Sequence, residues 1–196
     1  HDNCVFDGKH GARVQGADGK LTLIFMNGEK FRIAVLGSTR GTDMQSIIDA
    51  ITAKKLDAEI VLVVSDKKDA FILERAKAHK IKTFFIDYKK YAKRENSEKE
   101  IVTKLRAKKT DLILLIGFMK ILSPYFVREC TGRLWTIHPS LLPKYTGRMN
   151  LDVHAEVLRN HEKETGCTLH EVSEIVDGGK IIIQKKCPVM PNDTPQ

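Results

Sequence analysis

A histidine at the end of an expected strand is the first residue in this chain that could do chemistry. Residues 134–138 are expected to form a short strand that ends at His138, and a loop bounded by Pro139 and Pro143 follows. Side chains two residues apart in a strand point the same way, so Thr136 shares a face with His138. An imidazole with a pKa of about 6.5 can exchange protons near neutral pH, and open α/β sheets bind ligands at the carboxyl ends of their strands. The alternative interpretation is an ordinary hydrogen-bonded histidine.

A turn between an expected strand and an expected helix is a candidate anion site. The strand at 31–36 is followed by Ser38-Thr39-Arg40-Gly41-Thr42-Asp43, and residues 44–51 are apolar at helical spacing. Thr42 or Asp43 is the expected N-cap. The N–H groups and the dipole at a helix N-terminus attract phosphate; Arg40 strengthens that attraction and Asp43 opposes it. The turn has neither the Walker pattern nor G-x-G-x-x-G, so a plain strand-to-helix turn is the alternative.

The elements that must position these residues alternate between strands and helices. A continuous apolar run at 59–65 indicates a strand covered on both faces. Right-handed crossovers then predict an α/β fold with a mostly parallel, Rossmann-like open sheet and helices on both faces. The turn Asp177-Gly178-Gly179 joins the last two expected strands and predicts an antiparallel C-terminal hairpin. The expected strands are 21–25, 31–36, 59–65, 81–86, 111–116, 134–138, 167–172 and 180–187, and the expected helices are 44–51, 69–79, 97–108, 124–129 and 151–160, with Ser97 and Ser123 as caps.

Length and local composition divide the chain at residue 30. The 196 residues are enough for one α/β domain with a good core. Residues 1–20 are rich in Gly, Asp and Lys and show little periodicity, which indicates loop or disorder. The strand at 21–25 and the turn at Asn27-Gly28 are consistent with a hairpin leading into strand 31–36, or with a simple loop. We therefore expect an N-terminal extension at 1–30 and one domain at 31–196.

The charge balance favours an anionic partner. The formal net charge is +8 and the isoelectric point is about 9.3. The lysines are spread through the expected helices with few aromatic residues near them, whereas a nucleic-acid surface requires clustered basic and stacking side chains. We therefore expect small anionic ligands and no nucleic acid. A solvated basic surface is the alternative.

The cysteines and the hydropathy pattern limit the class of protein further. Cys4, Cys130, Cys167 and Cys187 lie far apart and show no C-x-x-C spacing, which predicts reduced thiols in a cytoplasmic protein. Cys167 and His170 form a C-x-x-H that no second pair completes, so we expect no metal site. No apolar run approaches about 20 residues, so we expect no contact with a membrane.

Three segments together resemble a known enzyme family. They are Ile137-His138-Pro139-Ser140-Leu141-Leu142-Pro143-Lys144-Tyr145, Gly117-Phe118-Met119-Lys120-Ile121-Leu122-Ser123-Pro124 and Asp177-Gly178-Gly179. With them, the chain from about residue 32 onward resembles the phosphoribosylglycinamide formyltransferases, the folate-dependent formyltransferases of purine synthesis. The wider formyltransferase group shares His-x-Ser-Leu-Leu-Pro. Pro139 and the Thr-Gly-Cys-Thr-Leu-His run at 165–170 resemble the glycinamide ribonucleotide branch.

The resemblance implies a reaction and three catalytic positions. The enzyme would transfer the formyl group of the co-substrate 10-formyltetrahydrofolate to the amine of glycinamide ribonucleotide, in the cytoplasm, as a monomer or homodimer and without a metal. The family uses an Asn, a His and an Asp. His138 and Asp177 match the last two, whereas Thr136 stands where the Asn is expected.

The resemblance also implies two binding regions. The family commonly reads Gly-x-Gly-Ser-Asn at its phosphate turn, and here Thr39 and Asp43 replace a Gly and the Asn. A C-terminal helix follows in the family and contributes to the ribonucleotide site, so we expect domain 31–196 to lack it. Ordinary core packing is the alternative for Met119 and Leu122. The implied residues are Thr39, Arg40, Gly41 and Thr42 for phosphate, and Met119, Lys120, Ile121, Leu122, Val127, Glu174, Val176 and Gly178 for folate and its lid.

Formyl transfer explains why these residue types are needed. Attack of an amine on the formyl carbon develops an oxyanion, and a donor aimed at that oxygen accelerates such reactions about 10²–10³-fold. His138 would transfer protons, while Asp177 would orient it and relay protons through water. Thr136 offers a short hydroxyl in place of a longer amide. A formyltetrahydrofolate hydrolase and a weakened folate- or phosphate-binding relative are therefore the alternative functions.

Overall fold

The computed structural model describes residues 13–17, 20–24, 30–148 and 151–195. The chain divides into two compact units, residues 1–133 and residues 134–196, and each is considered by itself. Among the described residues, the structure contains no helix that is long and apolar enough to cross a membrane.

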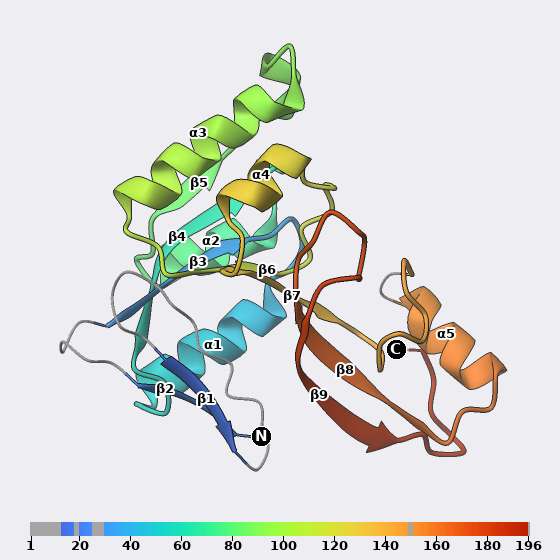
Figure 1. Ribbon diagram of the computed structural model, residues 1–196. Coiled ribbons are helices and arrows are strands. Elements are labelled where there is room, and N and C mark those ends of the chain that lie inside the picture. The colour runs from blue at the N-terminus through green and yellow to red at the C-terminus, as the bar shows by residue number, and fades with distance from the viewer. Residues whose placement is uncertain (1–12, 18–19, 25–29, 149–150, 196) are drawn as a thin grey trace. The chain divides into compact units, whose positions relative to one another are not determined.

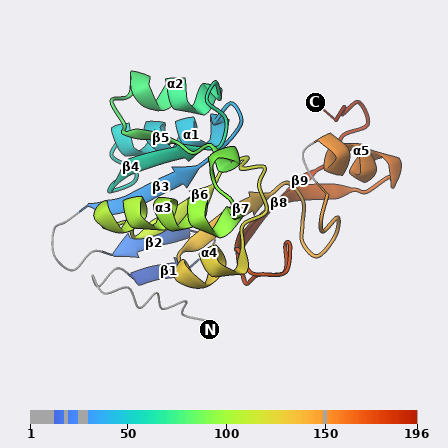
Figure 2. The ribbon, with the colours of Figure 1, turned by 90° about the horizontal axis from the view of Figure 1, so that it is seen from above.

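The first unit is built on a parallel sheet. Its strands are β3 (Phe31–Leu36), β4 (Ala58–Ser65), β5 (Thr83–Phe85) and β6 (Leu112–Leu115), in the order β5-β4-β3-β6 (Figure 2). β3 pairs in parallel with both β4 and β6, and β4 pairs in parallel with β5. Ala34, Val35, Leu36, Val63 and Val64 are fully buried. The continuous apolar runs therefore form central strands, as a sheet covered on both faces requires.

Helices cover both faces of this sheet. They are α1 (Thr42–Thr52), α2 (Phe71–Ala78), α3 (Arg94–Ala107) and α4 (Pro124–Glu129), with a short 3₁₀ helix, η1 (Tyr88–Lys90). Figure 1 shows α1 on one face and α3 with α4 on the other. α2 packs against α1, β4 and β5, and α3 packs against α4. The predicted arrangement of helices on both faces is confirmed.

Two predicted helix starts are wrong. α1 has Gly41 rather than Thr42 or Asp43 at its N-cap, with a left-handed backbone (φ 67°) and no side-chain cap. α3 begins at Arg94, after Lys93, and not at Ser97. Ser97 is buried inside the helix, where its Oγ donates to the Arg94 carbonyl at 2.5 Å. By contrast, Ser123 caps α4 as predicted, since its Oγ accepts from the Phe126 N–H at 3.3 Å.

The N-terminal strands pair with each other. β1 (Arg13–Ala17) and β2 (Lys20–Ile24) form a two-stranded antiparallel sheet. The expectation of loop or disorder is therefore wrong for residues 13–17. β2 pairs with β1 rather than with strand 31–36, so of the two interpretations of Asn27-Gly28, the hairpin into that strand is not borne out. The turn residues themselves lie outside the described part of the chain.

The second unit is an antiparallel arrangement of three strands with one helix. β7 (Leu134–His138), β8 (Glu164–Glu171) and β9 (Ile181–Pro188) run in the order β7-β8-β9, and α5 spans Leu151–Arg159. β8 pairs antiparallel with both neighbours. The predicted C-terminal hairpin is confirmed as β8 and β9. The register of β7 against β8 matters for function because it places His138 opposite Thr168 and Thr136 opposite His170.

Candidate active site

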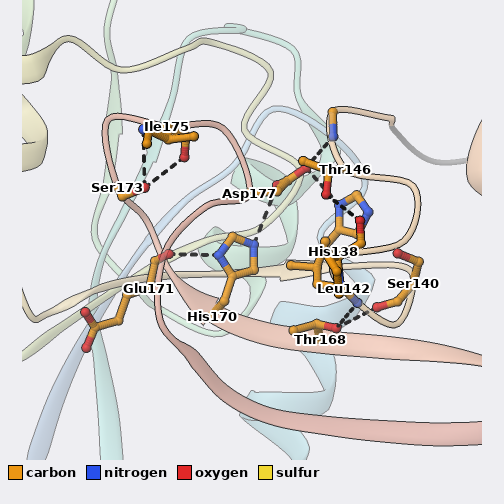
Figure 3. Close-up of polar contacts among 12 residues, drawn as sticks. His138, Ser140, Leu142, Thr146, Thr168, His170, Glu171, Ser173, Ile175 and Asp177 are labelled. Atoms are coloured by element: carbon orange, nitrogen blue, oxygen red, sulfur yellow. Dashed lines mark hydrogen bonds and ion pairs between the residues drawn. The ribbon is translucent and has the colours of Figure 1, made fainter.

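The second unit brings two histidines and one carboxylate together. Directly opposite residues of an antiparallel pair share a face, so His138, Thr136, Thr168 and His170 lie on the same side of β7 and β8. His138 is 4% exposed and His170 is 1% exposed. Figure 3 shows Asp177 between the two imidazole rings. The position of His138 at the end of a strand is as predicted, whereas His170 is not among the catalytic residues predicted from the sequence.

The Asp177 carboxylate has three close neighbours, of which one forms a hydrogen bond. Its Oδ2 accepts from the Gly147 N–H at 2.8 Å and lies 3.4 Å from His138 Nδ1. Its Oδ1 lies 3.6 Å from His170 Nε2. The side chain is only 14% exposed. The carboxylate can therefore stabilise a positive charge on either ring, and the Gly147 N–H holds it in place.

Steric crowding explains why a glycine stands two residues after Asp177. Asp177 itself adopts a left-handed backbone (φ 53°), which Asp tolerates better than most residues. A Cβ on Gly179 would come within 1.8 Å of the Glu171 carbonyl oxygen, so no side chain fits there. The Glu171 N–H donates to the Lys180 carbonyl at 2.9 Å. This close approach of the turn to the end of β8 places Asp177 beside the histidines.

The hydrogen bonds of His170 define its tautomer. His170 Nδ1 lies 2.8 Å from the Glu171 carbonyl oxygen, which can only accept, so Nδ1 carries the proton in the neutral ring. Its Nε2 then faces Asp177. His138 Nε2 and His170 Nε2 are both buried and have no hydrogen-bond partner among the described residues. A buried imidazole nitrogen without a partner is a position where a ligand can donate or accept a hydrogen bond.

The environment of His138 favours its neutral form. Burial lowers the pKa of the His138 imidazole below its usual 6.5, and the charge of His170 lowers this pKa further. The Asp177 carboxylate and a backbone hydrogen bond to Tyr145 oppose that change by raising the pKa. Burial is the largest of these effects. His138 is therefore an uncharged imidazole at neutral pH, which is the form that accepts a proton.

The loop after His138 is held by β8 and β9. Thr168 Oγ1 donates to the Ser140 carbonyl at 2.6 Å and accepts from the Leu142 N–H at 3.1 Å. Gln184 Nε2 donates to the Leu142 carbonyl at 2.9 Å. The peptide bond between Leu142 and Pro143 is cis. Side chains from two neighbouring strands therefore determine the path of the His-Pro-Ser-Leu-Leu-Pro segment.

The candidate phosphate turn lies in the first unit, at the carboxyl end of β3. Thr39, Arg40 and Thr42 are exposed, while Gly41 is buried. A Cβ on Gly41 would approach Ile72 to 2.4 Å, and its φ of 67° is in the left-handed region. The Ser38 N–H donates to the Gly117 carbonyl at 3.1 Å, and the Ile72 N–H donates to the Thr39 carbonyl at 3.1 Å. The turn thus presents three exposed residues at the N-terminus of α1.

Hydrogen bonds from α3 hold the segment that carries the candidate folate residues of the first unit. Arg94 Nη1 donates to the Ile121 carbonyl at 2.8 Å. Glu98 is fully buried, and its carboxylate accepts from the N–H of Ser123 at 3.0 Å and from the Ser123 hydroxyl. Lys120, Met119 and Ile121 are exposed, the last at 73%, whereas Leu122 and Val127 are each 8% exposed. The first three are accessible to a ligand, and the other two pack mainly in the core.

The candidate lid residues of the second unit lie on the turn before Asp177. Val176 is 53% exposed, and its neighbour Ile175 is 72% exposed. Ser173 Oγ donates to the Ile175 carbonyl at 2.8 Å and accepts from the Ile175 N–H at 3.3 Å. Glu174 and Gly178 flank these residues, and a Cβ on Gly178 would approach Ile175 to 2.7 Å. The turn therefore exposes two large apolar side chains next to the catalytic carboxylate candidate.

The sequence contains only part of the signal that brings His170 next to His138. β8 alternates, and Thr168 and His170 share the face that the register sets opposite Thr136 and His138. That register depends on the length of the segment between β7 and β8, which the pattern alone does not determine. Gly147 contributes only a backbone N–H, so no side-chain motif could have revealed it.

Comparison with known proteins gives one consistent result. The sequence model of the family described as "Formyl transferase" matches residues 31–196. Phosphoribosylglycinamide formyltransferase of Escherichia coli strain K12 is 41% identical over 162 residues, which cover 83% of this chain and 75% of that protein. The trifunctional purine biosynthetic protein adenosine-3 of Drosophila melanogaster is 46% identical over 164 residues, which cover 83% of this chain. This chain spans 12% of the length of that relative.

Solved structures show the same likeness. Phosphoribosylglycinamide formyltransferase from Coxiella burnetii, in complex with CHES, superposes with a TM-score of 0.79 at 40% identity, and the match covers 85% of this chain and 77% of that one. The corresponding protein from Bacillus halodurans gives a TM-score of 0.76 at 36% identity, and the match covers 84% of this chain and 83% of that one.

Proposed function

Because the chain belongs to the formyl transferase family, we propose that it transfers the formyl group of 10-formyltetrahydrofolate to the amine of glycinamide ribonucleotide. The observation that carries this proposal is the buried His138, whose Nε2 has no partner among the described residues and whose Nδ1 lies 3.4 Å from Asp177. We further propose a cytoplasmic protein that acts as a monomer or homodimer. Cys130, Cys167 and Cys187 are free thiols, which supports a reducing compartment.

His138 is the proposed general base. Its lowered pKa keeps it neutral, and the carboxylate beside Nδ1 favours the tautomer in which Nδ1 carries the proton. Nε2 is then the atom that accepts a proton from the attacking amine as the new C–N bond forms. The imidazolium returns this proton to the folate nitrogen as the formyl C–N bond of the donor breaks. Asp177 orients the ring and stabilises the imidazolium that forms, as a carboxylate partner does in other acid–base sites. His170 Nε2 lies 3.6 Å from the other oxygen of Asp177.

The co-substrate and the acceptor require different surfaces. A formyl folate combines a flat ring system with an anionic tail. We assign its apolar contacts to Met119, Ile121 and Val176, which are all exposed. Lys120, Leu122, Val127, Glu174 and Gly178 complete the proposed folate set. We assign the phosphate of the ribonucleotide to Thr39, Arg40, Gly41 and Thr42, where the N–H groups at the start of α1 and the Arg40 charge favour an anion.

An assay of folate absorbance with and without glycinamide ribonucleotide tests the function. We expect deformylated folate to accumulate only when the acceptor is present. Accumulation without acceptor would instead indicate a hydrolase. His138→Gln should reduce kcat/KM about 10²-fold or more, since general base catalysis contributes about that much. His154→Gln makes the same change at a half-buried histidine on α5 that has no proposed catalytic role, and should leave the rate unaltered. An equal effect of both substitutions would contradict the assignment.

Thr136 stands where the family resemblance implies a catalytic Asn. The structure places it on the face of β7 that carries His138, opposite His170. A threonine hydroxyl reaches less far than an Asn amide, so we expect weaker stabilisation of the developing oxyanion. Thr136→Asn should therefore raise kcat/KM by an amount equivalent to about 1–4 kcal/mol. Steady-state kinetics checks this, and an unchanged or lower kcat/KM would show that Thr136 is already adapted to its role.

A further inference from the structure

A pocket at the opposite end of the parallel sheet has no role in the proposed reaction. Its volume is about 450 Å³, within the range of small-molecule sites. It is lined by the first residues of β3 and β4 and by the segments that follow α2 and α3. α1 contributes its last turns, whereas its first residues form the candidate phosphate turn. The two sites therefore lie at opposite ends of an 11-residue helix, about 16 Å long.

The rim of this pocket is basic. Five cationic side chains line it, Lys30, Arg32, Lys80, Lys82 and Lys108, against one carboxylate, Glu59. Arg32 is already engaged, since its guanidinium pairs with Glu59 and its Nε donates to the Lys108 carbonyl at 2.8 Å. The four lysine ammonium groups form no ion pair with any described residue. Uncompensated positive charge therefore converges on one cavity.

Lysines also occur at this edge at backbone positions where glycine is usual. The chain turns through a left-handed residue after each of α1, α2 and α3, and these residues are Lys54 (φ 55°), Lys80 (φ 58°) and Lys109 (φ 46°). Glycine is the common choice at such a position. A lysine can also interact with the carbonyl groups at a helix C-terminus. That interaction explains a lysine near each helix end but not the convergence of four unpaired lysines on one cavity.

The floor of the pocket is aliphatic. Ile48, Ile51, Ile60 and Ile81 line it together with Ala58 and Val61. A simple inorganic anion would leave this surface exposed to water. The Arg32 guanidinium is already paired, so the cations that remain available to a ligand are lysines. Lysine ammonium groups act as point charges and suit densely charged phosphate groups better than a single planar carboxylate. The lining thus fits a ligand with an apolar body and several phosphate charges.

We propose that this pocket, at the amino ends of β3, β4 and β5, is a second ligand site that binds a small multivalent phosphate carrying an apolar body, of the nucleoside polyphosphate class. Lys80 and Lys82 hold the phosphates, and the isoleucine floor holds the body of the ligand. Binding weakens as ionic strength rises, because exposed charges are screened within about 10 Å at 0.1 M salt.

Methyl NMR of the full chain with labelled isoleucine tests the proposal. The probes are ATP, inorganic tripolyphosphate and adenosine, each without divalent cations. We expect saturable shifts of the Ile51, Ile60 and Ile81 methyl groups with ATP, and weaker affinity for the other two probes. Equal affinity for ATP and tripolyphosphate would overturn the role of the floor, and the absence of saturable shifts at these methyl groups would overturn the site itself.

Charge-reversal variants separate this site from the phosphate turn. Lys80→Glu and Lys82→Glu alter exposed side chains and should each weaken ATP binding at least about tenfold. Lys90→Glu makes the same change at an exposed lysine outside the pocket and should have no effect. Arg40→Ala removes a cation of the phosphate turn and should also leave these shifts unchanged. Binding that depends on Arg40 but not on Lys80 would contradict the proposal, and none of these outcomes depends on formyl transfer.

Discussion

At the residue scale, one carboxylate lies close to two buried imidazole rings. Asp177 Oδ2 lies 3.4 Å from His138 Nδ1, and Asp177 Oδ1 lies 3.6 Å from His170 Nε2. The Asp177 carboxylate raises the pKa of the His138 imidazole, whereas the charge of His170 lowers it. Because burial also lowers the pKa of His138, this ring stays neutral and ready to accept a proton.

The pKa of His138 gives a prediction with a definite sign. An NMR titration should show a His138 midpoint below 6.5. Asp177→Asn should lower the midpoint further, because the carboxylate raises this pKa, whereas His170→Gln should raise it by removing an opposing charge. A midpoint above 6.5, or a rise in Asp177→Asn, would contradict this account of the site.

The same shift links His138 to stability. Between the lowered pKa of the folded chain and the unfolded value of about 6.5, the unfolded chain binds more protons, so the free energy of unfolding falls as pH falls through this range. His138 therefore contributes full stability above about pH 6.5 and loses it below. Urea unfolding of the native chain and of His138→Gln should show a smaller loss in the variant between these pH values.

At the element scale, α3 holds the segment that leads into α4. Glu98 is 0% exposed and bonds to both the N–H and the hydroxyl of Ser123, the residue that caps α4. Arg94, one turn earlier, donates to the Ile121 carbonyl. One helix therefore fixes the path of residues 121–123 at two points, and the exposed Met119 and Ile121 lie on the segment so fixed.

Removal of the Glu98 carboxylate should be costly. Glu98→Ala leaves the Ser123 N–H and hydroxyl buried without an acceptor and should lower the free energy of unfolding by about 3 kcal/mol. Glu98→Gln keeps one acceptor oxygen and adds an amide donor for the hydroxyl, so about 1 kcal/mol is expected. Urea unfolding measures both. Glu95→Ala, at an exposed position in the first turn of α3, should lower the free energy of unfolding by about 0.5 kcal/mol. If Glu98→Ala lowers it by no more than this, the hydrogen bonds between Glu98 and Ser123 do not stabilise the fold as proposed.

The errors in the predicted elements have local physical reasons. Ser97 followed by acidic residues has the pattern of a helix start, but α3 begins one turn earlier, at Arg94, and the buried Glu98 bonds to Ser123 from inside the helix. Gly41 replaces a side-chain cap because Ile72 packs against the turn and leaves no room for a Cβ. Both helix starts depend on contacts with residues distant in the sequence, and local helix propensity does not contain that information.

At the scale of the whole molecule, the apolar runs and their alternation with helices predicted the fold class and the central strands β3, β4 and β6. They also predicted that His138 lies at a strand end. The participation of His170 required the register of β7 and β8. The basic pocket draws residues from five separate segments of the first unit, and such convergence follows from topology rather than from any motif.

Transfer of a labelled formyl carbon tests the central claim most directly. The full chain would be given 10-formyltetrahydrofolate with a ¹³C-formyl group and glycinamide ribonucleotide, and the products would be followed by mass spectrometry. We predict that the label appears on the ribonucleotide amine with the native chain, and that His138→Gln lowers the rate about 10²-fold or more. Label recovered only as free formate, or transfer that proceeds equally well without His138, would contradict the account.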